Sequence, residues 1–228
     1  VVAGLIKVAE GRGDCLAIVD PPFSLTVNEI IDWHNGTHPL NTLKLNSDFA
    51  ALYWPWVKIR DTFNAVDVWV PPSGGVMAAI ARNDQIEEPW FAPAGTTRGQ
   101  VPGISDVKSR PSAVERDLMY GNRSAINPIM QYAGSADFVI MGQKTLQRRP
   151  TALDRVNVRR LMFAIEKRLR VASRELLFDQ HDEQFRNRFN RIASSILTEV
   201  QVGRGITDFI IQSDDEINTP DVIDRNEF

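Results

Sequence analysis

The sequence predicts a mixed α/β fold, in which a layered sheet is flanked by helices. Short apolar runs that stop at prolines or glycines, as at 15–19 and 137–142, are typical of buried strands. Longer segments with apolar residues three and four positions apart, as at 156–177, are typical of amphipathic helices. Both kinds of segment occur along the chain, so we expect helices packed on a sheet.

The first elements have clear ends. Residues 1–10 predict the end of a helix that Gly11 and Gly13 terminate, and the strand at 15–19 follows. Residues 26–35 then predict an amphipathic helix, because Gly36 stands just past its last apolar residue.

An aromatic segment at 49–60 and the run at 65–70 predict a pair of strands joined by a hairpin loop. Pro55 lies inside the first of them, so we expect an edge or a bulge there. Two prolines end the second strand, and Ser73 is expected to cap a helix over 74–84.

Beyond residue 84, the sequence predicts some elements clearly and others poorly. Residues 85–124 are poorly periodic, with one short helix expected at 112–120. The strongest helices are expected at 156–177 and 183–200, and a last strand at 207–212.

A length of 228 residues predicts one large domain or two small ones. We expect a first part at 1–150, with the aromatic strands and the proline-rich turn, and a second part at 151–228, with two helices, a strand and an acidic tail. The chain does not begin with Met, so we expect a fragment or a processed protein.

The residue types leave little material for catalysis or metal binding. A single cysteine, Cys15, excludes an internal disulfide framework and a paired-cysteine metal cage. The three histidines are too few for a His-built metal site, and Gly36 makes a helix carrying both His34 and His38 unfavourable. No phosphate-binding loop, dinucleotide fingerprint, zinc-protease or serine-hydrolase motif occurs, so we expect no cofactor and no enzyme activity.

Two ligand-binding alternatives remain open. The strand-to-helix turn at 71–75 could cradle an anion, which leaves an α/β enzyme or small-ligand binder with a site there as the second hypothesis. Tyr53, Trp54 and Trp56 could stack on a ligand, although a core or edge-covering role is favoured.

Charge is distributed unevenly along the chain. Residues 144–191 hold 13 basic and 6 acidic residues, and residues 199–228 hold 2 basic and 8 acidic ones. This pattern indicates an electrostatic partner, subunits that meet head to tail, or simply two solvated faces of one domain. Because the sequence pI is about 5.7, a protein partner is favoured over nucleic acid.

Six motifs in order resemble the contractile tail sheath proteins of bacteriophages and related injection systems. They cover nearly the whole chain, at 14–22, 52–61, 69–84, 89–99, 125–146 and 156–161. One motif departs from the usual Gly-Ala-Arg-Thr-Leu, since this chain has Gly142-Gln143-Lys144-Thr145-Leu146. The chain also stops where the family continues into further strands and a C-terminal arm.

The resemblance implies a structural role and a core layer likened to the subtilisin fold, without protease activity. Sheath subunits polymerise around a tail tube and contract to drive it through the host envelope for genome ejection. Expected partners are other sheath subunits, the tube protein, the baseplate and the tail terminator, with no nucleic acid and no membrane insertion. The expected location is the virion tail, and the host cytoplasm during assembly. Without the linking arms, this chain is expected to be monomeric.

Within that picture, charged residues of the C-terminal third are the candidate contacts to the tube or to neighbouring subunits. The candidates are Arg160, Lys167, Arg170, Arg174, Arg186, Arg188, Arg191 and the acidic run Asp214, Asp215 and Glu216. For Arg159 and Arg160, an ion pair inside the domain that holds the start of the helix is equally expected.

Overall fold

The computed structural model describes residues 1–121, 124–132, 134–176 and 182–213. The chain divides into two compact units, Val1–Arg160 and Leu161–Phe228. The mixed α/β class is confirmed, whereas the comparison with subtilisin stays a prediction. The two parts at 1–150 and 151–228 likewise stay a prediction about the organisation of the protein.

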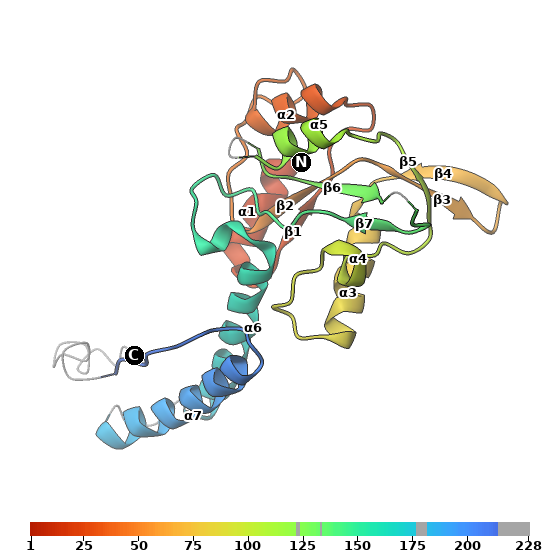
Figure 1. Ribbon diagram of the computed structural model, residues 1–228. Helices are drawn as coiled ribbons and strands as arrows, with labels where there is room; N and C mark the ends of the chain where they lie inside the picture. The colour runs from red at the N-terminus through yellow and green to blue at the C-terminus, as the bar shows by residue number, and fades with distance from the viewer. Residues whose placement is uncertain (122–123, 133, 177–181, 214–228) are drawn as a thin grey trace. The chain divides into compact units, whose positions relative to one another are not determined.

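The first unit is built on a four-stranded sheet with the strand order β1-β2-β6-β7 (Figure 1). The strands are β1 (Ala17–Val19), β2 (Ala50–Trp54), β6 (Ile126–Gln131) and β7 (Phe138–Ile140). Strands β1, β2 and β6 are parallel, and β7 is antiparallel to β6.

Both faces of this sheet are covered, as parallel strands require. Alternate residues of β2 point to opposite faces: Leu52 and Trp54 join one apolar cluster, and Ala51 and Tyr53 join the other. The helices of the first cluster are α1 (Val2–Arg12), α2 (Val27–Asn35) and α5 (Ala113–Met119); α3 (Ser73–Ile86) packs in the second. A short helix, α4 (Gly95–Arg98), precedes the next strand.

A smaller antiparallel sheet has the order β4-β3-β5. Its strands are β3 (Val57–Asp61), β4 (Val66–Val70) and β5 (Ile104–Val107). The first two form the expected hairpin, and Val57 and Val107 extend the second apolar cluster.

The prediction of one strand over 49–60 is wrong. The segment forms β2 of the large sheet and β3 of the small one, with a cis Trp54–Pro55 bond between them. Because Pro55 has no N–H to donate to a strand ladder, pairing is interrupted there and the chain changes sheets.

Two further expectations are wrong. Ser73 is the first residue of α3, after the N-cap Pro72, and no side chain of its own turn caps the helix. Residues 207–212 form no strand, and Ile210 is 84% exposed. A short apolar run becomes a strand only where another strand pairs with it, and the described residues offer none.

Three helix ends follow the sequence closely. Thr26 caps α2 with a reciprocal capping box to Glu29, and Gly36 ends it in the left-handed region at a φ of 75°. Helix α1 contains Gly11 and ends at Arg12, with Gly13 as its C-cap in the left-handed region. These ends were predictable because capping is local.

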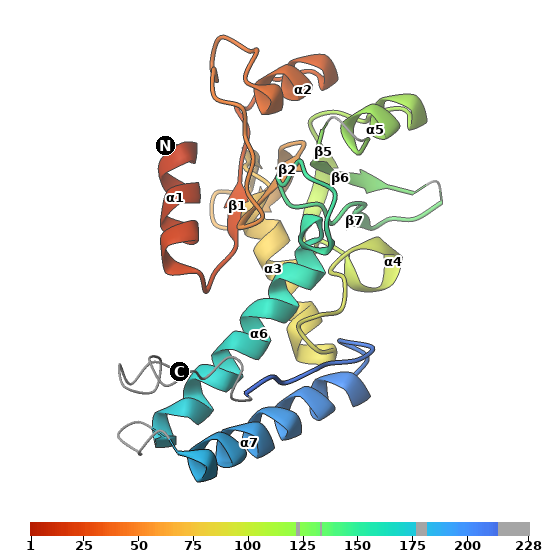
Figure 2. The same cartoon turned by 90° about the vertical axis from the view of Figure 1, so that its left-hand side faces the viewer.

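The second unit contains most of α6 (Val156–Ser173), a 3₁₀ turn, η2 (Arg174–Leu176), and α7 (Glu183–Val202). The two helices lie side by side in both views (Figures 1 and 2), and Arg168 pairs with Glu199 at 3.1 Å. Asp182 caps α7 through the amide of Phe185. A second 3₁₀ turn, η1 (Ala152–Asp154), leads into α6.

Candidate functional site

The predicted basic residues fall into two structural classes, divided at the first turn of α6. Arg160 has a side chain only 10% exposed, and its guanidinium is paired with Asp84 of α3. Arg159 is equally buried, pairs with Asp48 and lies over the ring of Phe49 with a separation of 4.0 Å. The intradomain ion pairs expected for these two arginines are therefore confirmed.

Hydrogen bonds to other segments also hold the first residues of α6 in place. Asn157 donates a hydrogen bond to the carbonyl of Trp90 at 3.2 Å, and the amide of Val156 donates to the carbonyl of Gln143 at 2.7 Å. The segment 156–160 thus connects loops that are far apart in the sequence. Packing within the first unit, and not a ligand, accounts for the residue types of this motif.

The remaining basic candidates lie in the second unit and form an exposed set. Lys167 and Arg170 of α6 are exposed three positions apart and share one side of the helix, and exposed Arg174 begins the 3₁₀ turn η2 four positions further on. Arg188 and Arg191 are exposed on α7, and Arg191 also donates to the carbonyl of Asn187. The other two groups are placed differently: Arg186 is half-buried, and Asp214, Asp215 and Glu216 lie outside the described residues.

The turn at 71–75 is occupied by the protein's own carboxylate. Oδ1 of Asp20 accepts a hydrogen bond from the amide of Ser73 at 2.9 Å, at the N-terminus of α3. A carboxylate is the group that the positive end of a helix prefers, so the chain itself supplies the anion there. At this turn, Asp20 therefore takes the place that an external anion would need.

The other residues considered for ligand binding are structural. Tyr53 and Trp54 are buried, and the indole N–H of Trp56 donates to the carbonyl of Pro21 at 2.8 Å. Cys15 packs on the first apolar cluster. Among the residues that the structure describes, no group of three potential metal ligands is found.

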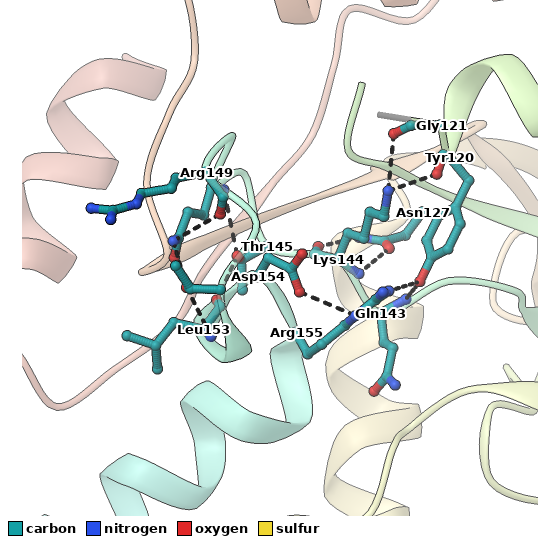
Figure 3. A network of polar contacts seen from close by, with 12 residues as sticks. Tyr120, Gly121, Asn127, Gln143, Lys144, Thr145, Arg149, Leu153, Asp154 and Arg155 are labelled. Carbon is teal, nitrogen blue, oxygen red and sulfur yellow. Dashed lines mark hydrogen bonds and ion pairs between the residues drawn. The ribbon is translucent and has the colours of Figure 1, made fainter. Parts of the chain in front are cut away.

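The departing motif at 142–146 organises a polar network (Figure 3). Nζ of Lys144 donates to the carbonyl oxygens of Tyr120 at 2.7 Å and Gly121 at 2.9 Å, where α5 ends. The backbone N–H of Lys144 donates to Oδ1 of Asn127 at 2.7 Å, and Nδ2 of Asn127 donates to the backbone carbonyl of Lys144 at 2.8 Å. Burial lowers the pKa of Lys144, with Arg155 as a second cause. Lys144 thus connects the loop before α6 to the end of α5.

Gly142 and Arg155 complete the network. A Cβ at Gly142 would lie 2.7 Å from Oδ1 of Asn127 and 2.8 Å from the ring of Tyr120, so only glycine fits without displacement. The guanidinium of Arg155 donates to the hydroxyl of Tyr120 at 3.0 Å. This network holds the loop before α6 in place, and it contains no nucleophile paired with a base.

A cavity of about 280 Å³ lies beside this network, and buried His34 lines it. Arg148 donates to Oδ1 of Asn35 at 2.7 Å and to the carbonyl of Leu45 at 3.0 Å. Burial, together with the nearby charge of Arg148, lowers the pKa of His34 to about 4. His34 is therefore neutral near pH 7, and the cations that line the cavity are bonded to protein oxygens.

Sequence reasoning missed two surface features of the first unit. One is the tip of the β3–β4 hairpin, where Phe63 is 94% exposed. The other is an apolar groove of about 490 Å³ between α1, β1 and α3. An aromatic residue inside an expected hairpin loop was the signal for the first, whereas the groove has no sequence signal because three distant segments form it.

No helix in the described ranges combines the length and the apolar character that a membrane crossing requires.

Comparison with known proteins identifies relatives over almost the whole chain. The family described as phage tail sheath protein central domain matches residues 1–146. The tail sheath protein of Vibrio phage KVP40 is 34% identical over 97% of this chain and 35% of its own length. That of Enterobacteria phage T4 is 29% identical over 98% of this chain and 35% of its own length. The chain thus spans about a third of these curated relatives.

Solved structures show the same fold. The sheath complex of an extracellular contractile injection system in its contracted state has a TM-score of 0.69 at 22% identity, over 88% of this chain and 51% of that one. A chain of the contracted baseplate of the anti-feeding prophage has a TM-score of 0.75 at 16% identity, over 99% of this chain and 58% of that one. With the match over residues 1–146, these findings place the chain in the family of phage tail sheath proteins.

Proposed function

We propose that this chain is the core of a structural subunit of a contractile tail sheath, which polymerises around the tail tube and contracts to drive it through the host envelope. The observation that carries the proposal is the match to sheath proteins of two phages over 97% and 98% of the chain. The solved neighbours belong to contractile assemblies by their descriptions, in both sheath and baseplate.

The physical character of the first unit supports a mechanical role. Its sheet is covered on both faces, and buried ion pairs and hydrogen bonds connect α6 to distant loops. Such a body moves as a rigid piece, which a rearrangement between two interface geometries requires. The polar networks of the described residues serve packing, so we propose that the subunit is not an enzyme.

We propose that the exposed basic residues of the second unit contact the tube or a neighbouring subunit. They are Lys167, Arg170, Arg174, Arg188 and Arg191, with half-buried Arg186 beside them. Each exposed ion pair contributes little, about 0–1 kcal/mol, so many such contacts can break in sequence when the sheath contracts. Arg160 does not belong to this exposed set, because its side chain is 10% exposed and paired with Asp84 inside the first unit. The acidic run at 214–216 remains the proposed counterpart.

The remaining partners follow from the same proposal. We expect other sheath subunits, the baseplate, the tube protein and the tail terminator as contacts, in the virion tail and, during assembly, in the host cytoplasm. Linking arms outside this chain would join neighbouring subunits by strand addition.

The test is charge reversal in the full-length protein. Replacing Lys167, Arg170, Arg188 and Arg191 by Glu should leave a folded subunit that no longer builds ordered sheaths in electron micrographs. The matched control reverses the same number of exposed basic residues in the first unit, Lys7, Lys44, Arg82 and Arg149. Ordered, contractile sheaths from the first variant would refute the contact proposal, and an unmodified full-length protein that never forms tubes would refute the function itself.

A further inference from the structure

Two unpartnered apolar features of the first unit complement one another. One is the groove beside β1, and the other is the tip of the β3–β4 hairpin. Both belong to the same compact unit but to different elements of it.

The groove has apolar walls and a free strand edge. Its walls come from Leu5 of α1, Leu16 and Ile18 beside and in β1, and Met77 and Ile80 of α3. Leu5 is 44% exposed and Met77 is 54% exposed, so the walls are open to solvent. Strand β1 is the outermost strand of its sheet, and the side away from β2 has no strand beside it in the described part of the chain.

One polar group at the groove is incomplete. Arg160 lines the groove with a side chain 10% exposed, and its Nη2 is paired with Asp84. Its Nη1 is buried and has no hydrogen-bond partner among the described residues. A buried guanidinium N–H without an acceptor is costly, so an occupant of the groove is expected to bring an oxygen to it.

The hairpin tip is held by hydrogen bonds to its own carboxylate and presents an aromatic ring. Oδ1 of Asp61 accepts hydrogen bonds from the amides of Phe63 at 2.9 Å and Asn64 at 3.2 Å. Its Oδ2 accepts from the side-chain amide of Asn64 at 2.7 Å, and these bonds lower the pKa of Asp61. Phe63 itself is 94% exposed, in the loop that joins β3 to β4.

A preorganised tip of this kind suits insertion. Little conformational entropy remains to be lost on binding when the loop is already held by its own carboxylate. Aromatic anchors that enter an apolar pocket contribute most of the energy in many interfaces. The amides of Phe63 and Asn64 donate to Asp61, whereas the carbonyl oxygens of Thr62 and Phe63 receive no donor from the described residues.

We infer that Phe63 of one copy of this chain inserts into the β1 groove of a second copy. The ring occupies the apolar walls, and a carbonyl oxygen of the tip accepts the free N–H of Arg160. Because the two surfaces differ, the contact is head to tail, and repeating it produces rings or helical filaments rather than a closed dimer. The inference rests on the proposed function, because only a polymer of subunits would form this contact repeatedly. It names one specific contact between neighbouring subunits.

The contact buries little surface, so a test has to trap it. One aromatic side chain and a few loop atoms bury far less than the roughly 1,200 Å² of a stable complex. The isolated chain is therefore expected to stay monomeric at micromolar concentration, so the contact has to be trapped.

Disulfide trapping between two variants detects it directly. In a Cys15→Ala background, one chain carries Thr62→Cys, next to the intact Phe63, and the other carries Ala81→Cys, which lines the groove. Mild oxidation of the concentrated mixture should give covalent dimers of one chain of each kind. The matched control replaces Ala81→Cys by Ala78→Cys, because Ala78 is an exposed alanine of the same helix that does not line the groove.

Two outcomes decide the inference. Cross-linking through Ala81→Cys should exceed that through Ala78→Cys by about tenfold, and adding Phe63→Ser to the Thr62→Cys chain should remove the excess. Equal yields at the two alanine positions, or an excess that survives Phe63→Ser, would overturn it.

The full-length protein separates this inference from the proposed function. Phe63→Ser should leave the thermal unfolding of the subunit unchanged, because the residue is 94% exposed, and should reduce tube formation. If the unmodified protein forms tubes and Phe63→Ser forms them equally well, the inference is wrong and the function stands. If the unmodified protein forms none, the proposed function is wrong.

Discussion

The ammonium group of Lys144 donates to the carbonyl oxygen of Tyr120 at 2.7 Å and lies over the ring of the same residue, 4.6 Å from its centre. Tyr120 follows the last turn of α5, where carbonyl groups have no partner inside the helix. A cation at that end also complements the helix dipole. The side chain of Lys144, 24 residues further along the chain, thus caps the C-terminal end of α5.

Replacing Lys144 by Met should destabilise the first unit by about 1–3 kcal/mol, since the carbonyl groups of Tyr120 and Gly121 lose a charged donor. Lys144→Arg is the control, and it should stay close to the parent because its guanidinium can also bond two carbonyl groups. Urea unfolding followed by circular dichroism measures both. Equal stabilities for Lys144→Met and the parent would contradict this account.

His34 should make stability depend on pH. Its pKa is about 4 in the folded chain and about 6.5 when exposed. Below pH 6.5 the unfolded chain therefore binds a proton that the folded chain does not, and stability falls by up to about 3 kcal/mol as the pH is lowered to 4. Above pH 6.5 both states are neutral at this residue, and it contributes no pH dependence.

His34→Gln removes this titration, so its unfolding free energy should fall less steeply between pH 6.5 and 4 than that of the parent. Chemical unfolding at several pH values gives both curves, and carboxylates that titrate in the same range act equally on the two proteins. Parallel curves would show that His34 is accessible to protons in the folded state.

Asp20 should matter more for α3 than Ser73 does. Asp20→Ala removes the carboxylate that accepts the amide of Ser73, at a cost of about 0.5–2 kcal/mol typical of a lost helix cap. Ser73→Ala should change stability by less than about 0.5 kcal/mol, because the hydroxyl caps nothing. Thermal unfolding of the two variants compares them, and the reverse order would restore Ser73 as the cap.

The arginines should separate into two groups on removal of charge. Arg159→Met leaves Asp48 without its buried partner and should cost about 3–5 kcal/mol. Arg170→Met, at an exposed position, should change stability by less than about 0.5 kcal/mol. Urea unfolding distinguishes them, and a large loss for Arg170→Met would show that this residue holds the fold rather than a partner.

The elements that the sequence predicts well are those with local signals. Helix α2 carries its own start and end, since Thr26 and Glu29 form a capping box and Gly36 takes a left-handed conformation. The apolar stripe of α6 is likewise periodic. Its prediction over 156–177 agrees with the structure up to Ser173, η2 replaces the helix at 174–176, and residue 177 lies outside the described ranges. The order of the motifs was enough to indicate the sheath family.

Tertiary structure decided what depends on distant partners. Strand β6 was missed because Pro128 and the buried Asn127 break the apolar pattern, and Asn127 is accommodated only because Leu52 and Lys144 supply its hydrogen-bond partners. The run at 207–212 has strand composition but no strand to pair with among the described residues. The same reason divides the arginines: the sequence shows their charge and spacing, but whether a carboxylate such as Asp84 lies opposite depends on how remote segments pack.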